Sequence, residues 1–319
     1  MNKQFVALLV LLGAASVYLY SLENKTEDSA YGFQQFKFDF SKKYMREGEE
    51  QYRKSIFLRN LVKINEHNAN PSNTYTMGVN QFTDLTDAEF SSLYLTLQVP
   101  ANKKVVDFSD VSVPSINGDV DWVADGKVTP VKNQGQCGSC WAFSATASIE
   151  SAYMIKSGSS PSLSEQQLVD CSRKYGNQGC NGGWMDSAFD FVIDNGLTDT
   201  PSYPYVARDQ TCKTPGGSYT IGDYVDTPGC TDLFNALSAR PISVAVDASN
   251  WSPYKSGIFS NCAKNVNHGV LLVGATDDYW KIKNSWGASW GDQGFIRLGR
   301  TSANSNTCAI CQYPSYPTL

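Results

Sequence analysis

The chain has 319 residues, which is long for one small domain and indicates more than one hydrophobic core. Apolar residues make up 41% of it and aromatic residues 12%, so the composition excludes a mostly disordered chain. The net charge is −5 and the lysines and arginines are scattered, which argues against nucleic acid as a partner.

The first residues have the parts of a secretory signal peptide. A lysine precedes the apolar run Phe5–Leu12, and small residues follow at Gly13–Ser16. The alternative is a membrane anchor, but this run is too short to span a bilayer comfortably. We therefore expect a signal peptide over residues 1–21, cleaved after Ser16 or Ser21, and no membrane association. A chain of this kind is expected in the secretory pathway, with a lysosome, a related acidic vacuole or the extracellular space as its destination.

Residues 22–112 contain no cysteine and differ from the rest of the chain. Their first part carries two amphipathic helical patterns, marked by apolar residues at Phe33, Phe36, Phe40 and Tyr44 and then at Tyr52, Ile56, Phe57, Leu61 and Ile64. A short β-like run at 75–79 and a polar linker at 101–110 follow. We expect a helical pro-region over 22–112 and a mature domain over 113–319.

The mature domain changes character near its middle. Helices are expected from Cys140 to about Asn195, with a capping-box sequence at Ser164–Gln167. After Tyr219 the apolar runs predict strands, at 242–246, 270–273, 279–283 and 295–298. The fold class is therefore α+β, with a helical half and a β half. A cleft between two such halves is a common place for a ligand.

A candidate nucleophile begins the helical half. Cys140 opens an apolar, alanine-rich run, so the helix dipole is expected to favour its thiolate. The chain has two histidines, and His67 lies in the pro-region, so a catalytic histidine of the mature domain can only be His268. The imidazole can take the thiol proton and form an ion pair before substrate arrives, with the pKa of the thiol lowered.

Three further residues complete the expected machinery. Asn284 can fix the imidazole by accepting its other N–H, and Trp286 can shield that bond from water. Gln134 lies six residues before Cys140, so its side-chain amide can join the Cys140 backbone N–H in an oxyanion hole.

The same residues allow other interpretations. Cys137 and Cys140 have the spacing of a thioredoxin-like redox pair, but no βαβ pattern surrounds them. A zinc site is disfavoured by a single histidine and the lack of a second Cys-x-x-Cys, so we expect no metal and no cofactor. His268 alone would be a structural core residue; beside Cys140, Asn284 and Gln134 the catalytic interpretation is favoured.

Several motifs resemble those of the papain-like cysteine proteases, in particular the cathepsin L-like branch. They are Val128–Gly135, Cys137–Trp141, Leu163–Cys171 and Lys283–Gly287. The resemblance implies a papain-like two-domain fold with the cleft between its halves, and an endopeptidase that works through an acyl-enzyme. The absence of a spare histidine for an occluding loop disfavours a cathepsin B-like exopeptidase. The alternatives from other classes are a non-catalytic relative that binds peptides and a disulfide oxidoreductase.

The pro-region adds to the resemblance. Its residues follow the interspersed ERFNIN pattern and a second pro-region motif, at Glu49, Arg53, Ile56, Phe57, Asn60, Ile64 and Asn68 and at Gly78, Asn80, Phe82 and Asp84. An ordinary amphipathic helix explains the apolar positions of this pattern but not its asparagines. The resemblance implies a self-inhibited zymogen whose pro-region runs backwards through the cleft. Basic residues of the pro-region are mixed with carboxylates such as Asp84, and protonation of paired carboxylates is expected to loosen it in acid. It also implies a monomer with protein or peptide substrates and cystatin-type inhibitors.

The resemblance also assigns most of the nine cysteines. It implies three disulfides, Cys137–Cys180, Cys171–Cys212 and Cys262–Cys308, with Cys140 free. Cys230 and Cys311 lie outside the family pattern; they can form a fourth disulfide with each other or remain two buried thiols.

The substrate-binding residues are likewise implied by position. They are Gly183 for main-chain contacts, and Trp184, Met185, Ala245, Val266, Asn267 and Tyr313 around the pocket for the substrate residue two before the cut. Tyr313 is bulky and uncharged, so we expect a short apolar pocket that prefers Leu or Val over Phe and disfavours Arg.

Overall fold

The computed structural model describes residues 31–103, 119–301 and 305–319. The expected signal peptide, most of the linker and the boundary between residues 112 and 113 lie outside these residues. The described chain divides into two compact units. One comprises the chain up to Asn73 together with Met77–Thr86, and the other comprises Thr74–Thr76 together with Asp87–Leu319. No helix among the described residues is long and apolar enough to cross a membrane.

The first unit is built on two helices, α2 (Phe33–Asp39) and α3 (Glu47–Ala69). The rings of Phe33, Phe36 and Phe57 pack between them, with centroids 4.8–6.0 Å apart. The predicted first helix is too long, because α2 ends at Asp39 and the chain turns at Ser41, whose φ is 52°. Phe40 and Tyr44 pack against the same core from outside the helix.

The polar residues of the pro-region motifs hold the loop that follows α3. The Asn60 side chain donates to the carbonyls of Thr83 and Leu85, at 2.9 and 3.0 Å. The buried carboxylate of Asp84 accepts from Lys42 Nζ at 2.7 Å and from the Tyr44 hydroxyl at 2.8 Å. These bonds satisfy buried backbone and carboxylate groups, which explains why this region needs more than an apolar helix face.

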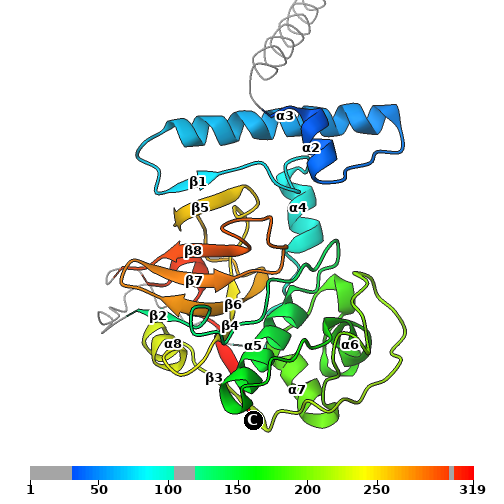
Figure 1. Ribbon diagram of the computed structural model, residues 1–319, viewed down its shortest axis with the longest axis vertical. Coiled ribbons are helices and arrows are strands. Elements are labelled where there is room, and N and C mark those ends of the chain that lie inside the picture. Colours follow the sequence, from blue (N-terminus) through cyan, green and yellow to red (C-terminus); the bar gives the residue numbers. More distant parts are fainter. Residues whose placement is uncertain (1–30, 104–118, 302–304) are drawn as a thin grey trace, which may run out of the picture. The chain divides into compact units, whose positions relative to one another are not determined.

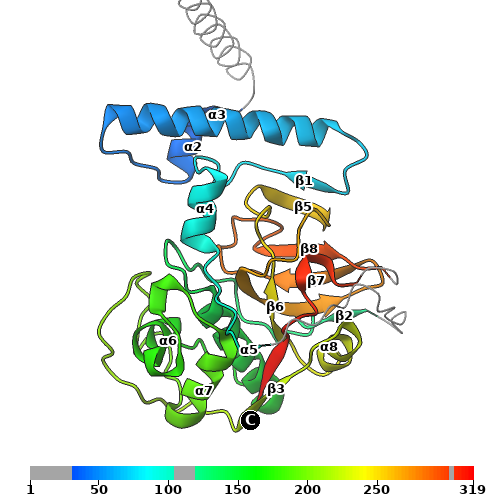
Figure 2. The same ribbon diagram turned by 180° about the vertical axis from the view of Figure 1, so that it is seen from behind.

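The second unit has a helical half and a β half, as predicted. The helices are α4 (Asp87–Tyr94), α5 (Cys140–Ser157), α6 (Glu165–Cys171), α7 (Met185–Asn195) and α8 (Cys230–Leu237). Figures 1 and 2 show α6 and α7 on one side of α5 and the strands β6, β7 and β8 on the other. Short 3-10 turns lie at Ser172–Tyr175, Gly179–Asn181 and Thr307–Ala309.

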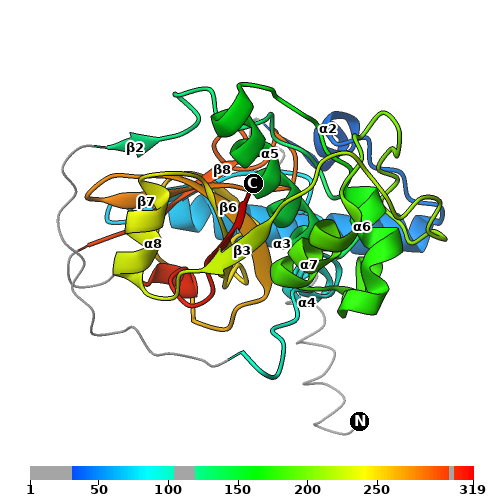
Figure 3. The ribbon, with the colours of Figure 1, turned by 90° about the horizontal axis from the view of Figure 1, so that it is seen from below.

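The strands join in one sheet of order β1-β5-β8-β7-β6-β4-β9-β3, with β2 paired to β6. Their bounds are β1 Tyr75–Met77, β2 Val120–Asp121, β3 Asp223–Asp226, β4 Ile242–Val246, β5 Tyr254–Phe259, β6 His268–Ala275, β7 Tyr279–Lys283, β8 Phe295–Gly299 and β9 Ser315–Thr318. The four predicted strands correspond to β4, β6, β7 and β8. The strand pattern did not reveal α8, which lies beside the sheet in Figure 3.

The capping-box prediction holds in part. The Ser164 hydroxyl caps α6 by accepting from the Gln167 backbone N–H at 3.0 Å. The Gln167 side chain does not complete the box; it bonds the backbone of Thr198, Thr214 and Gly216 and ties α6 to a neighbouring loop. Gly196 ends α7 with a φ of 72°, a left-handed value that favours glycine.

Four disulfides stabilise this unit. They are Cys137–Cys180, Cys171–Cys212, Cys262–Cys308 and Cys230–Cys311. The last joins the start of α8 to the loop before β9, with Cα atoms 4.9 Å apart, so the two cysteines outside the family pattern bond to each other. Cys140 is the free cysteine.

A buried charge cluster connects α5, α6 and the loop that precedes Cys140. The Lys132 ammonium lies 2.7 Å from Glu150 and 2.6 Å from Glu165, and both carboxylates are almost completely buried. These carboxylates raise the pKa of Lys132 against the lowering effect of its burial. Two buried carboxylates therefore share one cation.

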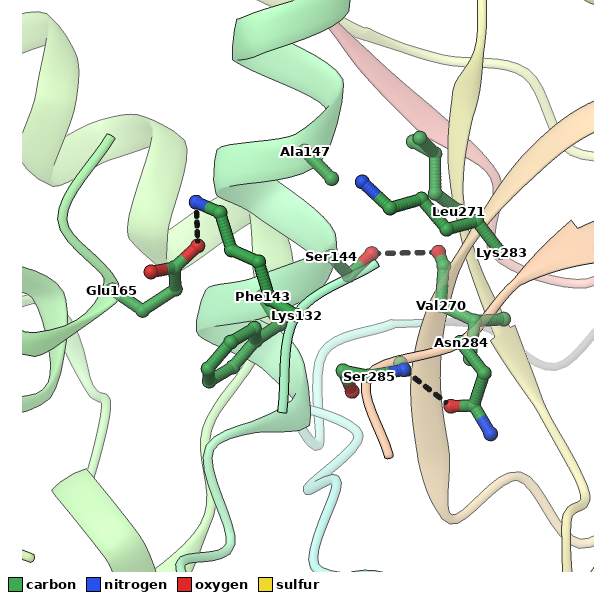
Figure 4. Close-up of a pocket in the computed structure, with 11 residues that line it drawn as sticks. Lys132, Phe143, Ser144, Ala147, Glu165, Val270, Leu271, Lys283, Asn284 and Ser285 are labelled. Atoms are coloured by element: carbon green, nitrogen blue, oxygen red, sulfur yellow. Dashed lines mark hydrogen bonds and ion pairs between the residues drawn. The ribbon is translucent and has the colours of Figure 1, made fainter. Parts of the chain in front are cut away.

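The cluster extends to the β half. The Thr129 hydroxyl donates to Glu150 at 2.5 Å and accepts from Lys283 Nζ at 3.0 Å, which brings β7 into the network. Burial lowers the pKa of Lys283 to about 8. Figure 4 shows Lys132 and Glu165 on one side of α5 and Lys283 on the other, around a cavity of about 20 Å³. A cavity of this size accommodates no more than a water molecule, so it is no substrate pocket.

Replacing Lys132 by Met should destabilise the second unit by about 3–5 kcal/mol, because Glu150 and Glu165 would stay buried without their shared cation. All seven tryptophans lie after residue 112, so tryptophan fluorescence during guanidinium unfolding reports on this unit. The matched control is Lys281→Met, which removes a half-exposed ion pair with Asp121 and should cost less than about 1 kcal/mol. Equal losses in the two variants would contradict the role of the cluster.

Candidate active site

Cys140 is the first residue of α5 and is fully buried. Burial raises the pKa of its thiol to about 11, although the backbone N–H groups of Gly269, Trp141 and Thr96 donate towards the sulfur and oppose this rise. The expected lowering of the thiol pKa is therefore wrong for this state of the protein. The physical reason is desolvation, which disfavours the thiolate more than the helix dipole and the amides favour it.

His268 begins β6, directly before the Gly269 amide that reaches the thiol. Its Nε2 lies 2.8 Å from Asn284 Oδ1, an atom that also accepts from the Ser285 backbone N–H. Since a carbonyl oxygen only accepts, Nε2 carries the proton and Nδ1 is the basic nitrogen. Within the described part of the chain, Nδ1 has no hydrogen-bond partner. Burial lowers the pKa of His268 to about 4, so the imidazole is neutral.

Trp286 covers the imidazole. Its ring centroid lies 4.7 Å from that of His268, at an interplanar angle of 30°. The rings of Phe90 and Tyr94, both on α4, pack edge-on against Trp286, with ring centroids 5.2 and 6.4 Å from that of the indole. Trp251 packs edge-on to His268 at 6.2 Å, a contact that the sequence patterns did not suggest. The aromatic layer keeps water from the bond between His268 and Asn284.

Gln134 lies buried beside the same loop. Its Nε2 donates to the Cys137 carbonyl at 3.0 Å, and its Oε1 accepts from the Ser285 hydroxyl at 2.8 Å. The second bond orients the amide so that its N–H groups face the residues just before Cys140. The structure thus brings together Cys140, His268, Asn284, Trp286 and Gln134, which are spread over about 150 residues of sequence.

Residues 95–98 cover the thiol. The Thr96 backbone N–H points at the Cys140 sulfur, and Leu97 forms a parallel bridge with Gly183. The Leu97 N–H donates to the Asn267 carbonyl at 3.1 Å, and the Gln98 N–H donates to the Gly183 carbonyl at 3.1 Å. A covering segment was predicted from the resemblance, but the residues that form it were not.

Glycine permits this close approach. A Cβ at Gly182, where φ is 117°, would overlap the Thr96 carbonyl oxygen, and one at Gly138 would overlap the Thr96 side chain. The backbone can come this near only where no side chain intervenes.

Leu97 lies in an apolar cluster with the residues expected to form the main pocket. Four of these pocket residues are buried members of the cluster, namely Trp184, Met185, Ala245 and Tyr313. Val266 packs against the cluster. The Tyr313 ring is 8% exposed and meets Trp184 edge-on with centroids 5.5 Å apart. Tyr313 therefore points into the cluster. Within residues 31–103, 119–301 and 305–319 no group of His, Cys, Asp or Glu is arranged to hold a metal.

Comparison with known proteins agrees with this geometry. Residues 116–318 match the model of the papain family cysteine proteases, and residues 33–90 match the cathepsin propeptide inhibitor domain (I29). Cathepsin L 2 of Paramecium tetraurelia is 46% identical over 98% of this chain and 100% of its own length. Cathepsin S of Bos taurus is 42% identical over 88% of this chain and 90% of its own.

Solved precursor structures are similar as well. Digestive procathepsin L 3 of Tenebrio molitor larval midgut has a TM-score of 0.80 and 38% identity, covering 90% of this chain and 97% of its own. The match extends over the propeptide inhibitor domain and the protease domain together. This chain belongs to the papain family of cysteine proteases and is a cathepsin L-like member that carries its own propeptide inhibitor domain.

Proposed function

We propose that this chain is the zymogen of a cysteine endopeptidase in which Cys140 is the nucleophile and His268 the general base and acid. The bond between His268 Nε2 and Asn284, beside a buried thiol at a helix N-terminus, carries the proposal. His268 Nδ1 takes the thiol proton, and the sulfur attacks the substrate carbonyl carbon. The imidazolium then protonates the leaving amine as the peptide bond breaks. Water, deprotonated by His268, hydrolyses the thioester and releases the thiol.

The oxyanion of both tetrahedral intermediates needs hydrogen-bond donors. We assign this role to the Gln134 side chain and the Cys140 backbone N–H. Support comes from the Ser285 hydroxyl, which holds Gln134 Oε1 and leaves Nε2 as the group available to a ligand. Nε2 now donates to the Cys137 carbonyl, a bond that can be exchanged or shared when substrate enters.

The proposal also includes the division of the chain into three segments and the destination of the protein. We assign residues 1–21 to a signal peptide, 22–112 to the pro-region and 113–319 to the mature protease. The destination is a lysosome, a related acidic vacuole or the extracellular space. The mature enzyme acts as a monomer on proteins and peptides and is a target of cystatin-type inhibitors.

Cys140→Ala and His268→Ala should each lower kcat/KM by at least about 10⁴-fold, because nucleophile and base act as one unit. Each precursor is processed in trans by a tagged wild-type enzyme that is then removed, and peptide hydrolysis is measured. Lys156→Ala, an exposed position near the far end of α5, serves as control and should keep wild-type activity. Substantial hydrolysis by the folded Cys140→Ala protein would refute the mechanism.

Acid should promote activation of the precursor, and the part due to His268 is isolated in a Cys140→Ala precursor, in which no thiol can give its proton to the imidazole. The pKa of His268 is about 4 in the covered state, in which the ring is fully buried, and it should rise towards its ordinary value of 6.5 once residues 95–98 leave and water reaches the ring. Between pH 4 and pH 6.5, His268 therefore binds a proton more tightly in the open state than in the covered state. The covered state is therefore fully favoured above pH 6.5 and loses stability as the pH falls towards 4, by up to about 3 kcal/mol.

This linkage can be measured as protection of residues 95–98 from hydrogen exchange in the Cys140→Ala precursor, which cannot process itself. The opening free energy, corrected for intrinsic exchange, should fall between pH 6.5 and 4.5. Adding His268→Gln should flatten this dependence. Asp84→Asn is the companion variant, since Asp84 holds Lys42 and Tyr44 within the pro-region unit. A slope that survives His268→Gln and disappears with Asp84→Asn would assign the pH response to the carboxylate.

The main pocket should select a medium-sized apolar side chain two residues before the cut. Leu97 packs with the same apolar residues, and Tyr313 is held among them by its contact with Trp184. None of the residues expected to line the pocket carries a carboxylate of its own, so none of them can pair with a basic side chain.

Matched peptides with Leu, Val, Phe or Arg at this position should be cleaved with Leu and Val preferred over Phe and Arg cleaved least. The expected ratio of kcat/KM between Leu and Phe is about tenfold, as for other differences in apolar fit. Tyr313→Ala should deepen the pocket and reverse the order of Leu and Phe. A wild-type preference for Phe would mean that Tyr313 does not limit the pocket.

A further inference from the structure

Lys103 follows residues 95–98, which cover the thiol, and its side chain lies in an acidic site away from the thiol. The Lys103 ammonium lies 2.8 Å from the Asp186 carboxylate and 2.5 Å from that of Asp226. Burial alone would lower the pKa of Lys103, but its bonds to Asp186 and Asp226 raise it above the ordinary value. Under the proposed function Lys103 leaves with the pro-region, so these carboxylates lose their cation when the enzyme matures.

Asp186 is built into the protease rather than displayed on its surface. It lies in the first turn of α7 and is 96% buried, since its exposure is 4%. One oxygen, Oδ2, accepts from the Trp184 indole N–H at 2.8 Å. The other, Oδ1, is buried and has no hydrogen-bond partner among the residues that the structure describes. A carboxylate this buried needs a cation or donors, and one of its oxygens still has a free acceptor site.

More negative charge faces the same groove. Asp190 lies one turn further along α7 and lines the groove together with Asp186, Tyr224 and Gly183. Partial burial and then the nearby Asp186 and Asp194 raise the pKa of Asp190, as expected where carboxylates crowd together. Gly183 is also the residue whose backbone pairs with Leu97 and Gln98. The acidic groove is thus continuous with the main-chain contacts of the expected substrate site.

We propose that Asp186, Asp190 and Asp226 form a subsite of the mature protease that binds a Lys or Arg side chain of the substrate. The chain passes from Thr96 at the thiol through Leu97 in the main pocket and on to Lys103. A substrate with its second residue before the cut in that pocket places its more N-terminal residues towards the acidic groove. The basic residue therefore lies upstream of the pocket residue. Lys103 occupies in the zymogen the place that this side chain takes in the enzyme.

The competing interpretation is that the ion pairs of Lys103 only hold the covering segment in place. The two interpretations differ in the processed enzyme. A tether has no function once the pro-region is gone, whereas a subsite gives the enzyme a charge preference at a position distant from the cut.

The test uses enzyme processed from the full-length precursor and peptides with Leu in the main pocket. Lys or the uncharged norleucine is placed at each of the third to sixth positions before the cut. At one position Lys should give a kcat/KM about fivefold to tenfold above norleucine, and 0.5 M NaCl should reduce this ratio. The ratio should fall to about one in Asp186→Asn and in Asp226→Asn. The exposed Asp125→Asn is the charge-matched control and should keep the wild-type ratio.

Asp226 is 46% exposed, so its variant keeps the test available if Asp186→Asn does not fold. The same peptides are also measured as ligands of processed enzyme whose Cys140 thiol is blocked as a methyl disulfide. Hydrolysis in which the ratio of kcat/KM between Lys and norleucine is about one at all four positions would overturn the subsite and leave the protease proposal intact. A Lys preference that persists in both Asp variants would overturn the assignment to these residues. Lys-dependent binding without any hydrolysis would support the subsite and refute the protease proposal.

Discussion

The close packing of α5 against β6 is the constraint on which the site depends. The Ser144 hydroxyl donates to the Val270 carbonyl at 2.7 Å, and the Ser144 carbonyl accepts from the Ser243 hydroxyl at 3.0 Å. The helix face at this junction carries small residues, so the backbones approach closely enough for both bonds. This contact places the N-terminus of α5, with Cys140, beside the start of β6, with His268. The proposed nucleophile and the proposed base come from different halves and meet because the halves are joined here.

The buried charge cluster also stabilises this junction, because it links α5 to α6 and to β7. Lys132 lies two residues before Gln134, and Lys283 directly precedes Asn284. Two residues of the expected machinery therefore lie within two positions of lysines that are held by buried bonds. Charged groups in a low-dielectric interior tolerate little displacement, because each must keep its partner. The cluster thus fixes the loops from which the site is built.

Covering the site changes its chemistry as well as its access. With residues 95–98 in place, burial keeps the thiol protonated and the imidazole neutral. Under the proposed mechanism, the ion pair of Cys140 and His268 forms when the segment leaves and water restores the solvation of both charges. Inhibition by the pro-region and suppression of the nucleophile are two consequences of one desolvation. The stretch that begins with this segment supplies Leu97 to an apolar cluster and, further along, Lys103 to an acidic groove.

The sequence by itself was enough to nominate the residues proposed for the site. A single histidine in the mature domain left one candidate base, and the helix beginning at Cys140 and the strands around His268 followed from local periodicity. The α+β class and the two-part precursor could also be predicted, because composition and periodicity change along the chain. The pairing of Cys230 with Cys311 remained open, since spacing alone cannot tell whether two cysteines 81 residues apart come together.

Only the tertiary structure decided the protonation state of Cys140 and His268. Their pKa values depend on burial, and part of that burial comes from residues more than forty positions before Cys140 in sequence. For the same reason the partners of Lys103, which lie 83 and 123 residues away, could not be predicted from any local pattern. Periodicity reports which face of a segment is buried; it does not report which distant charge or side chain covers it.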